Sequence, residues 1–198
     1  CRTWGLRSTD IMQGVVFGTR LDEMNGDERL YTRFDIDQCF GTVVNRYCAE
    51  AVIGHPLSPY GKGQQRRGFI PLRDSMQCLA IALGNPPQSG QYRVFNQFAE
   101  LFNVTELATK VQDVGARLGL DVTIQNLQNP RREKEEHFYE ADHQHLHDLG
   151  YRPTHTVEEE LSLMLADLLK HRERIEYKQD VLIPDIHWDG TRKKVGNI

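Results

Sequence analysis

The sequence lacks an apolar run near the ~20 residues that a transmembrane helix needs, and no charged-then-apolar signal peptide follows Cys1. It also lacks an excess of basic charge. Its 24 lysines and arginines against 28 aspartates and glutamates give a net charge of −4, which disfavours general electrostatic binding to nucleic acid. The four cysteines, Cys1, Cys39, Cys48 and Cys78, form no C-x-x-C pair, so neither a zinc ribbon nor a dense disulfide framework is expected. We therefore expect a soluble intracellular protein with reduced cysteines.

Sequence motifs of nucleotide-binding proteins, short-chain dehydrogenases and serine hydrolases are also missing. The loop Gly61–Gly68 has Arg66 where the dinucleotide fingerprint needs its third glycine, and Phe69 where a P-loop needs lysine. None of the seven tyrosines is followed four residues later by lysine, and no G-x-S-x-G is present. Because the chain also opens at Cys1 without an initiator methionine, we expect it to begin partway through a gene product.

Short strand-like runs alternate with helical ones, which predicts an α/β protein. Residues 8–18 predict one strand, and the apolar spacing from Phe40 predicts a helix that Gly54 ends. The remaining expected elements are an extended run over 57–60, strands over 68–71, 92–96 and 121–125, helices capped by Asp74, Asn103 and Thr156, and a loosely attached polar tail after Arg174. Pro71 suggests a sheet edge or a strand end.

Four histidines lie within eleven residues: His137, His143, His145 and His147. His143 and His147 have the i, i+4 spacing with which a helix can hold a metal. However, there is no H-E-x-x-H, and the neighbouring residues are acidic. Exposed histidines on a solvated helix are the favoured interpretation, so no metal site is expected.

Several short segments are weak motifs singly but form a recognisable series. They are Asp10–Gly18 (DIMQGVVFG), Phe40–Arg46 (FGTVVNR), Gly54–Leu57 (GHPL), Tyr60–Gly63 (YGKG), Gln65–Phe69, Arg73–Asp74, Arg93–Gln97 and Asn129–Glu133. In this order and spacing they resemble the carboxy-terminal half of the UDP-sulfoquinovose synthase family. That family belongs to the extended short-chain dehydrogenases of the NAD-dependent epimerase/dehydratase superfamily.

The resemblance implies an α/β fold that is the C-terminal part of a Rossmann-type extended short-chain dehydrogenase, with the smaller α/β substrate-binding domain. Residues 1–39 would then be the last part of the dinucleotide-binding domain and a connecting loop. Residues 40–173 would be the substrate-binding region with returning Rossmann elements, and 174–198 a C-terminal arm. Because the family's catalytic Tyr-x-x-x-Lys precedes the matched segment, the catalytic residues are expected upstream of Cys1, and the isolated chain is expected to be inactive.

The family's reaction implies the ligands. NAD, bound mainly by the upstream half, oxidises C4 of UDP-glucose, water is eliminated at C6, sulfite adds, and the hydride returns to C4. The expected partners are UDP-glucose or another UDP-sugar, sulfite or a sulfite-donor protein, and a second copy in a homodimer, but no nucleic acid and no membrane. The expected location is the cytoplasm, or the plastid stroma in a plant or alga.

A UDP-sugar needs cations for its two phosphates and polar groups for its base and hydroxyls. The resemblance assigns Arg67 and Arg131 to the diphosphate, because a guanidinium fork matches phosphate oxygens. It assigns Gln13 to the sugar, and Val16 to the nicotinamide side of NAD. The full expected substrate set is Gln13, Val43, Val44, Asn45, Arg46, Ser58, Pro59, Tyr60, Arg67, Arg131, Arg132 and Glu133.

Simpler roles stay open for some of these residues. Val43 and Val44 lie on the apolar helix face, where core packing explains them equally well, and Arg46 could be a solvated helical arginine. For the whole chain, the alternatives are another UDP-sugar epimerase or dehydratase, or a non-catalytic nucleotide-sugar-binding module. A Tyr-x-x-x-Lys and a glycine fingerprint upstream would reject the non-catalytic module.

Overall fold

The computed structural model describes residues 1–31, 33–37, 39–130 and 141–184. Its strands are β1 (Ser8–Gln13), β2 (Val15–Phe17), β3 (Arg66–Pro71), β4 (Tyr92–Gln97) and β5 (Glu100–Asn103). Its α-helices are α1 (Val43–Ile53), α2 (Leu72–Gly84), α3 (Val104–Arg117), α4 (Gln144–Asp148), α5 (Val157–Leu169) and α6 (Arg172–Glu176). Short 3₁₀ turns cover Arg2–Trp4, Asp22–Met24, Glu28–Leu30 and Gln179–Val181. The expected α/β class is confirmed.

The single strand expected over residues 8–18 is wrong, because Gly14 divides it between two sheets. β1 pairs in parallel with β4, whereas β2 pairs in parallel with β3, which is antiparallel to β5. The Gly14 N–H donates to the Gln97 carbonyl at 2.8 Å. A Cβ at Gly14 would lie 2.5 Å from the carbonyl oxygen of Gly68, so only glycine permits this close crossing of the backbones.

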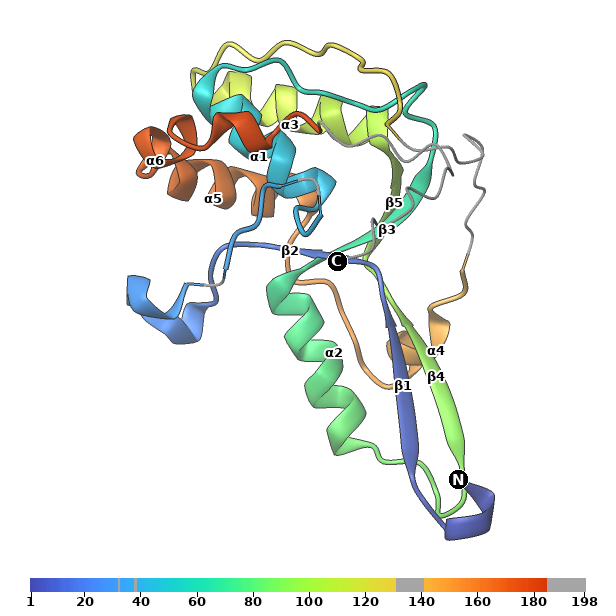
Figure 1. Ribbon diagram of the computed structural model, residues 1–198. Coiled ribbons are helices and arrows are strands. Elements are labelled where there is room, and N and C mark those ends of the chain that lie inside the picture. The colour runs from blue at the N-terminus through green and yellow to red at the C-terminus, as the bar shows by residue number, and fades with distance from the viewer. Residues whose placement is uncertain (32, 38, 131–140, 185–198) are drawn as a thin grey trace, which may run out of the picture.

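Two units are visible in Figure 1. Helices α1, α3, α5 and α6 gather beyond the β2-β3-β5 sheet, and the β1–β4 pair extends away from them beside α2. The larger apolar cluster includes Val44, Tyr47, Leu107, Leu161 and Leu165, and the smaller one is formed by Ile70, Cys78, Ala82, Phe95, Leu146 and Tyr151. The unit formed by β1, β4 and α2 therefore joins residues near the start of the chain to residues 72–97.

The expected helix caps are confirmed at two of three positions. Asn103 and Thr156 each form a capping box, with Glu106 and Glu159 respectively. The cap predicted at Asp74 is wrong: α2 begins at Leu72, directly after the last residue of β3, and Asp74 is buried in its first turn. Pro71 ends β3, as one of the two expectations for it stated, but β3 lies between β2 and β5 and is not an edge strand.

Three further expectations need correction. The helix expected from Phe40 begins at Val43, with Thr42 as its N-cap, and Phe40 is exposed. Residues 121–125 form only an isolated bridge, Leu57 with Ile124, instead of a strand. The tail after Arg174 is not loose at its start, because Ile175 and Leu182 are buried in the larger cluster.

The proposed domain boundaries stay a prediction. Among the helices of the described ranges, none is both long enough and apolar enough to cross a bilayer.

Candidate functional site

The carboxyl ends of β1 and β4 form the first part of the candidate site. Gln13 and Gln97 end these strands opposite each other in the register, and the chain then leaves both of them for the second sheet. Ligands of α/β proteins bind where neighbouring strands diverge in this way. The Gln13 side chain is exposed here, and its Nε2 donates to Ser75 Oγ on α2 at 3.2 Å. Val16, expected on the NAD side, lies just beyond this point on β2 and packs against the smaller apolar cluster.

Four of the expected substrate residues meet at a second place, where α1 faces the extended segment 57–60. The Arg46 guanidinium donates from Nη2 to the Ser58 carbonyl at 3.0 Å and lies 4.1 Å from the centroid of the Tyr60 ring. Glu50 accepts hydrogen bonds from the Ser58 N–H and hydroxyl, and its carboxylate lies 3.6 Å from Arg46 Nε. Arg46 and Glu50 are both buried. Arg46 is therefore neither a solvated helical arginine nor a free cation, and Pro59 is held between two anchored neighbours.

Burial dominates the chemistry of this pair. It raises the pKa of Glu50, while the Arg46 guanidinium and the Ser58 hydrogen bonds oppose the shift. A buried charge that loses its partner is costly, so the pair fixes the position of segment 57–60 relative to α1. Sequence reasoning missed Glu50, whose only signal is its i+4 spacing from Arg46.

The other helix residues of the expected set divide by burial. Val44 is fully buried in the larger cluster, and Val43 packs at its margin, which supports core packing for both. Asn45 is half-buried, and its Nδ2 donates to the Asp35 carbonyl at 3.1 Å. Its side chain thus holds the 33–37 segment against the start of α1.

Arg67 stands apart from the buried arginine. It is half-buried on β3, and its side chain makes one hydrogen bond, from Nη1 to the carbonyl of Arg66 at 2.8 Å. No described carboxylate pairs with it within 4.0 Å, so its charge is available to a ligand. The remaining predicted residues, Arg131, Arg132 and Glu133, lie outside the described residues.

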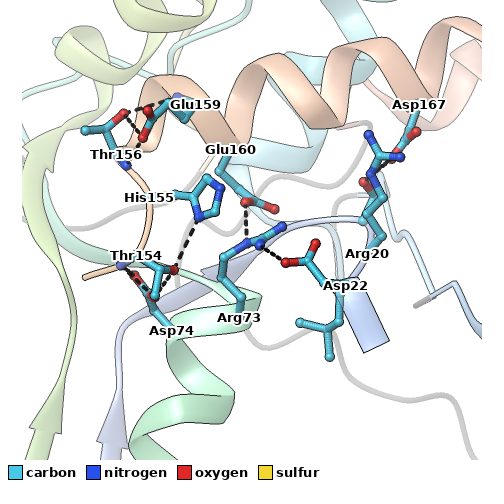
Figure 2. A network of polar contacts seen from close by, with 12 residues as sticks. Arg20, Asp22, Arg73, Asp74, Thr154, His155, Thr156, Glu159, Glu160 and Asp167 are labelled. Carbon is cyan, nitrogen blue, oxygen red and sulfur yellow. Dashed lines mark hydrogen bonds and ion pairs between the residues drawn. The ribbon is translucent and has the colours of Figure 1, made fainter. Parts of the chain in front are cut away.

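A polar network that the sequence did not indicate joins the chain after β2 to α2 and α5 (Figure 2). Arg73 Nε lies 3.3 Å from Glu160, and Arg73 Nη1 lies 3.1 Å from Asp22. Asp167 accepts from the Thr19 hydroxyl at 2.7 Å and pairs with Arg20 at 3.2 Å. The members come from segments up to 148 positions apart, so no local pattern could reveal them.

Within this network, Glu160 is fully buried, and its Oε1 has no hydrogen-bond partner among the described residues. Burial raises the pKa of Glu160, and the Arg73 guanidinium opposes that shift. Asp74, expected as a cap, instead accepts from the Thr154 backbone N–H at 3.1 Å. The network therefore holds the segment that leads into α5 against α2. Its role is structural, and it lies outside the expected substrate set.

Two of the four histidines, His143 and His147, form a row of neighbouring rings with Tyr151, and His137 lies outside the described residues. The His143 and His147 rings are 4.9 Å apart, and His147 lies 5.0 Å from the Tyr151 ring. Within the described ranges, no group of three or more His, Cys, Asp or Glu side chains is arranged to hold a metal ion. Burial in this row, together with the neighbouring His143, lowers the pKa of His147.

A cleft of about 760 Å³ lies elsewhere, between the 19–37 segment and helices α5 and α6. Its lining combines acidic residues such as Asp35 and Asp37 with basic ones such as Arg33 and Arg174. None of the expected substrate residues that the structure describes lines it. The cleft is thus lined by other residues than the predicted UDP-sugar site, although Asp35, which lines it, accepts a hydrogen bond from Asn45 Nδ2.

The curated relatives found by sequence include two UDP-sulfoquinovose synthases. The chain is 49% identical to the UDP-sulfoquinovose synthase of Sulfolobus acidocaldarius over 185 residues, which is 93% of this chain and 47% of that protein. It is 43% identical to the chloroplastic UDP-sulfoquinovose synthase of Spinacia oleracea over 196 residues, which is 99% of this chain and 39% of that protein. The chain therefore spans less than half the length of these relatives. No family model matches it.

Solved structures were found by fold. A UDP-glucose 4-epimerase of Thermotoga maritima, with UDP-glucose, superimposes with a TM-score of 0.66 at 19% identity, covering 86% of this chain and 48% of that one. A dTDP-glucose 4,6-dehydratase of Streptomyces venezuelae, with NAD bound, gives 0.60 at 18% identity, covering 87% and 47%. At these identities the likeness carries the fold alone, and it confirms the expected one. The chain is thus similar to UDP-sulfoquinovose synthases over nearly all of its own length and less than half of theirs, and it has the mixed α/β fold of part of an extended short-chain dehydrogenase of the epimerase/dehydratase type.

Proposed function

We propose that this chain is the UDP-sugar-binding half of an NAD-dependent enzyme that converts UDP-glucose and sulfite to UDP-sulfoquinovose. The observation that carries the proposal is the 49% and 43% identity to two relatives of that name across 93% and 99% of the chain. The motifs that suggested this family in the sequence lie within that span. The second substrate is sulfite, free or delivered by a donor protein.

The geometry supports a binding site built from three places. The base and ribose lie against segment 58–60, which Arg46 and Glu50 anchor to α1. The diphosphate lies at Arg67, whose guanidinium has no described carboxylate partner. The sugar extends to the exposed Gln13 at the carboxyl end of β1.

The segment after residue 123 supports the same arrangement. Leu57 bridges to Ile124, and Tyr60 bridges to Leu127. The matched motif that carries Arg131, Arg132 and Glu133 begins at Asn129, two residues after the second bridge. Residues 124–127 thus run beside the Tyr60 segment just before the motif that is proposed to bind the diphosphate and ribose.

In the proposed site, this chain contributes one contact to NAD, at Val16 on the nicotinamide side. Val16 lies on β2, and within the described residues β2 pairs with β3 alone, so one edge of its backbone is open for hydrogen bonds to a carboxamide. NAD supplies the hydride acceptor when bound, and its remaining contacts come from upstream of Cys1, as do the catalytic groups. The proposal also includes a homodimer, and a location in the cytoplasm or, as the name of the spinach relative says of that protein, in a plastid.

Product analysis with the whole protein that contains this chain tests the proposal. The purified protein is incubated with UDP-glucose, with and without sulfite, and the nucleotide sugars are separated. Sulfite-dependent formation of UDP-sulfoquinovose is expected. Formation of UDP-galactose or of a 4-keto-6-deoxy sugar would instead identify an epimerase or a dehydratase, and binding of UDP-glucose without any product would identify a non-catalytic module.

A further inference from the structure

Three side chains meet where the parallel strands β1 and β4 end. Gln13 and Gln97 occupy the last position of each strand, opposite one another, and Ser75 lies in the first turns of α2. Gln97 is 0% exposed and Ser75 is 3% exposed, whereas Gln13 is exposed. A buried amide and hydroxyl must satisfy their hydrogen bonds among themselves or with the backbone. The buried Ser75 and Gln97 therefore lie behind the exposed Gln13 side chain.

The direction of the hydrogen bonds follows from one backbone carbonyl. Gln97 Nε2 lies 2.9 Å from the Ser75 carbonyl oxygen, which can only accept, so this end of the Gln97 amide must be the NH₂ group. Its Oε1 is then directed at the Ser75 hydroxyl, 3.4 Å away, and accepts a hydrogen bond from it. The remaining lone pairs of Ser75 Oγ accept a donor.

That donor is the amide of Gln13. Its Nε2 lies 3.2 Å from Ser75 Oγ, and the opposite orientation would bring two acceptors together. The Gln13 carbonyl oxygen Oε1 therefore points away from Ser75. In the part of the chain that the structure describes, Oε1 receives no hydrogen bond.

We propose that Ser75 and Gln97 are positioning residues that lock the Gln13 amide so that its carbonyl oxygen accepts a hydrogen bond from a hydroxyl of the bound sugar. This inference rests on the proposed UDP-sugar site. An unlocked glutamine presents NH₂ and C=O about equally, whereas a locked one presents only an acceptor and selects a hydroxyl over a carbonyl or carboxylate at that position. Neither Ser75 nor Gln97 needs to touch the ligand.

The test is a calorimetric titration of UDP and of UDP-glucose into the whole protein and its variants. The variant Ser75→Ala removes the acceptor of Gln13, and Ser75→Thr restores the hydroxyl. Losing one oriented hydrogen bond should weaken UDP-glucose binding about three- to tenfold. UDP, which lacks the glucosyl group, should bind Ser75→Ala within about twofold of the parent protein, and Ser75→Thr should recover most of the UDP-glucose affinity. Ser162→Ala, a half-buried serine on α5, is the matched control and should bind both ligands as the parent does.

Each outcome has one meaning. A selective loss for UDP-glucose supports the inference, and unchanged UDP binding shows that the variant is folded. Equal loss for both ligands assigns Ser75 a merely structural role and overturns the inference, as does no loss at all. If the parent protein binds neither ligand, the proposed function itself fails, and this result is distinct from the other two.

Discussion

Arg46 and Arg67 both belong to the expected substrate set, but they have different environments in the structure. Arg46 is buried, donates to the Ser58 carbonyl and stacks on the Tyr60 ring. Arg67 is half-buried, and among the described residues its side chain bonds only to the neighbouring Arg66 carbonyl. Because Arg67 pairs with no described carboxylate, we expect it to be the diphosphate ligand of the two, whereas Arg46 holds the Ser58–Tyr60 segment.

Replacing Arg67 should therefore weaken nucleotide binding directly. A charge-assisted contact to phosphate contributes about 1.5–3 kcal/mol, so Arg67→Ala in the whole protein should bind UDP about ten- to hundredfold more weakly. Arg67→Lys should restore only part of the loss, because an ammonium cannot reproduce the bidentate fork. Calorimetric titration with UDP is the measurement. Arg172→Ala, an arginine paired only with Glu176 at the surface, is the control, and equal UDP affinity of Arg67→Ala and the parent would remove Arg67 from the site.

The buried Glu160 predicts how stability depends on pH. Burial raises its pKa above the ordinary value of 4.5, so the folded state holds the proton more tightly than the unfolded state. Its contribution to stability is complete below pH 4.5 and is lost as the pH rises through the raised pKa. The melting temperature of the parent protein relative to Glu160→Gln should therefore fall as the pH increases from 4.5 towards 8.

Glu159→Gln supplies a control of opposite sign. Hydrogen bonds from Thr156 lower the pKa of Glu159, so its contribution is present above its ordinary pKa and is lost as the pH falls. Thermal melts of the three proteins across the same pH series test both directions. A constant difference between the parent and Glu160→Gln would show that Glu160 does not titrate differently on folding.

At the scale of helices and strands, the sequence predicted those features that depend only on neighbouring residues. The capping boxes at Asn103 and Thr156, and the stop at Gly54, depend on residues within four positions, and all three are present. The break at Gly14 depends on the approach of Gly68 and Gln97, which no window around residue 14 contains. β5, with only four residues, was missed for the same reason, because its pairing with β3 defines it.

In the candidate site too, the partners that are distant in sequence could not be predicted. Gln13 was predicted from the resemblance, but its partners Ser75 and Gln97 lie 62 or more positions further along the chain. Arg46 and the Ser58–Tyr60 segment were predicted separately, and their contact, like the burial of Arg46 beside Glu50, depends on tertiary packing. The positions of Arg131, Arg132 and Glu133 remain a prediction from the resemblance alone.

The β1–β4 pair carries a prediction about the isolated chain. One face packs against α2 through Phe95, but Met12, Tyr92 and Val94 on the other face are 51%, 58% and 37% exposed. Parallel sheets are normally covered on both faces, and two strands alone are marginal. The isolated 198-residue chain should therefore bind an apolar dye and melt without a sharp transition.

Substitution on that face makes the test specific. The double variant Met12→Ser, Val94→Ser should bind clearly less dye, whereas Leu83→Ser, a single exposed leucine on α2, should change dye binding little. Dye fluorescence and thermal melts report both properties. A cooperative melt with no dye binding would mean that the face is stable without cover.

At the scale of the whole molecule, the chain carries the proposed binding residues but lacks two sequence motifs of its relatives' superfamily. Its sequence contains neither a dinucleotide fingerprint nor a Tyr-x-x-x-Lys pair. The purified chain alone should therefore neither retain NAD nor convert UDP-glucose and sulfite. Chromatography of the reaction mixture, with a no-protein blank, measures this, and UDP-sulfoquinovose above the blank would contradict it.

The central claim is that this chain holds the UDP-sugar between Gln13, Arg67 and the Ser58–Tyr60 segment. A crystal structure of the whole protein with UDP-glucose bound tests that claim most directly. The account predicts the diphosphate on the Arg67 guanidinium, the uracil against segment 58–60, and a sugar hydroxyl donating to Gln13 Oε1. UDP-glucose bound instead in the 760 Å³ cleft between the 19–37 segment and helices α5 and α6 would contradict it.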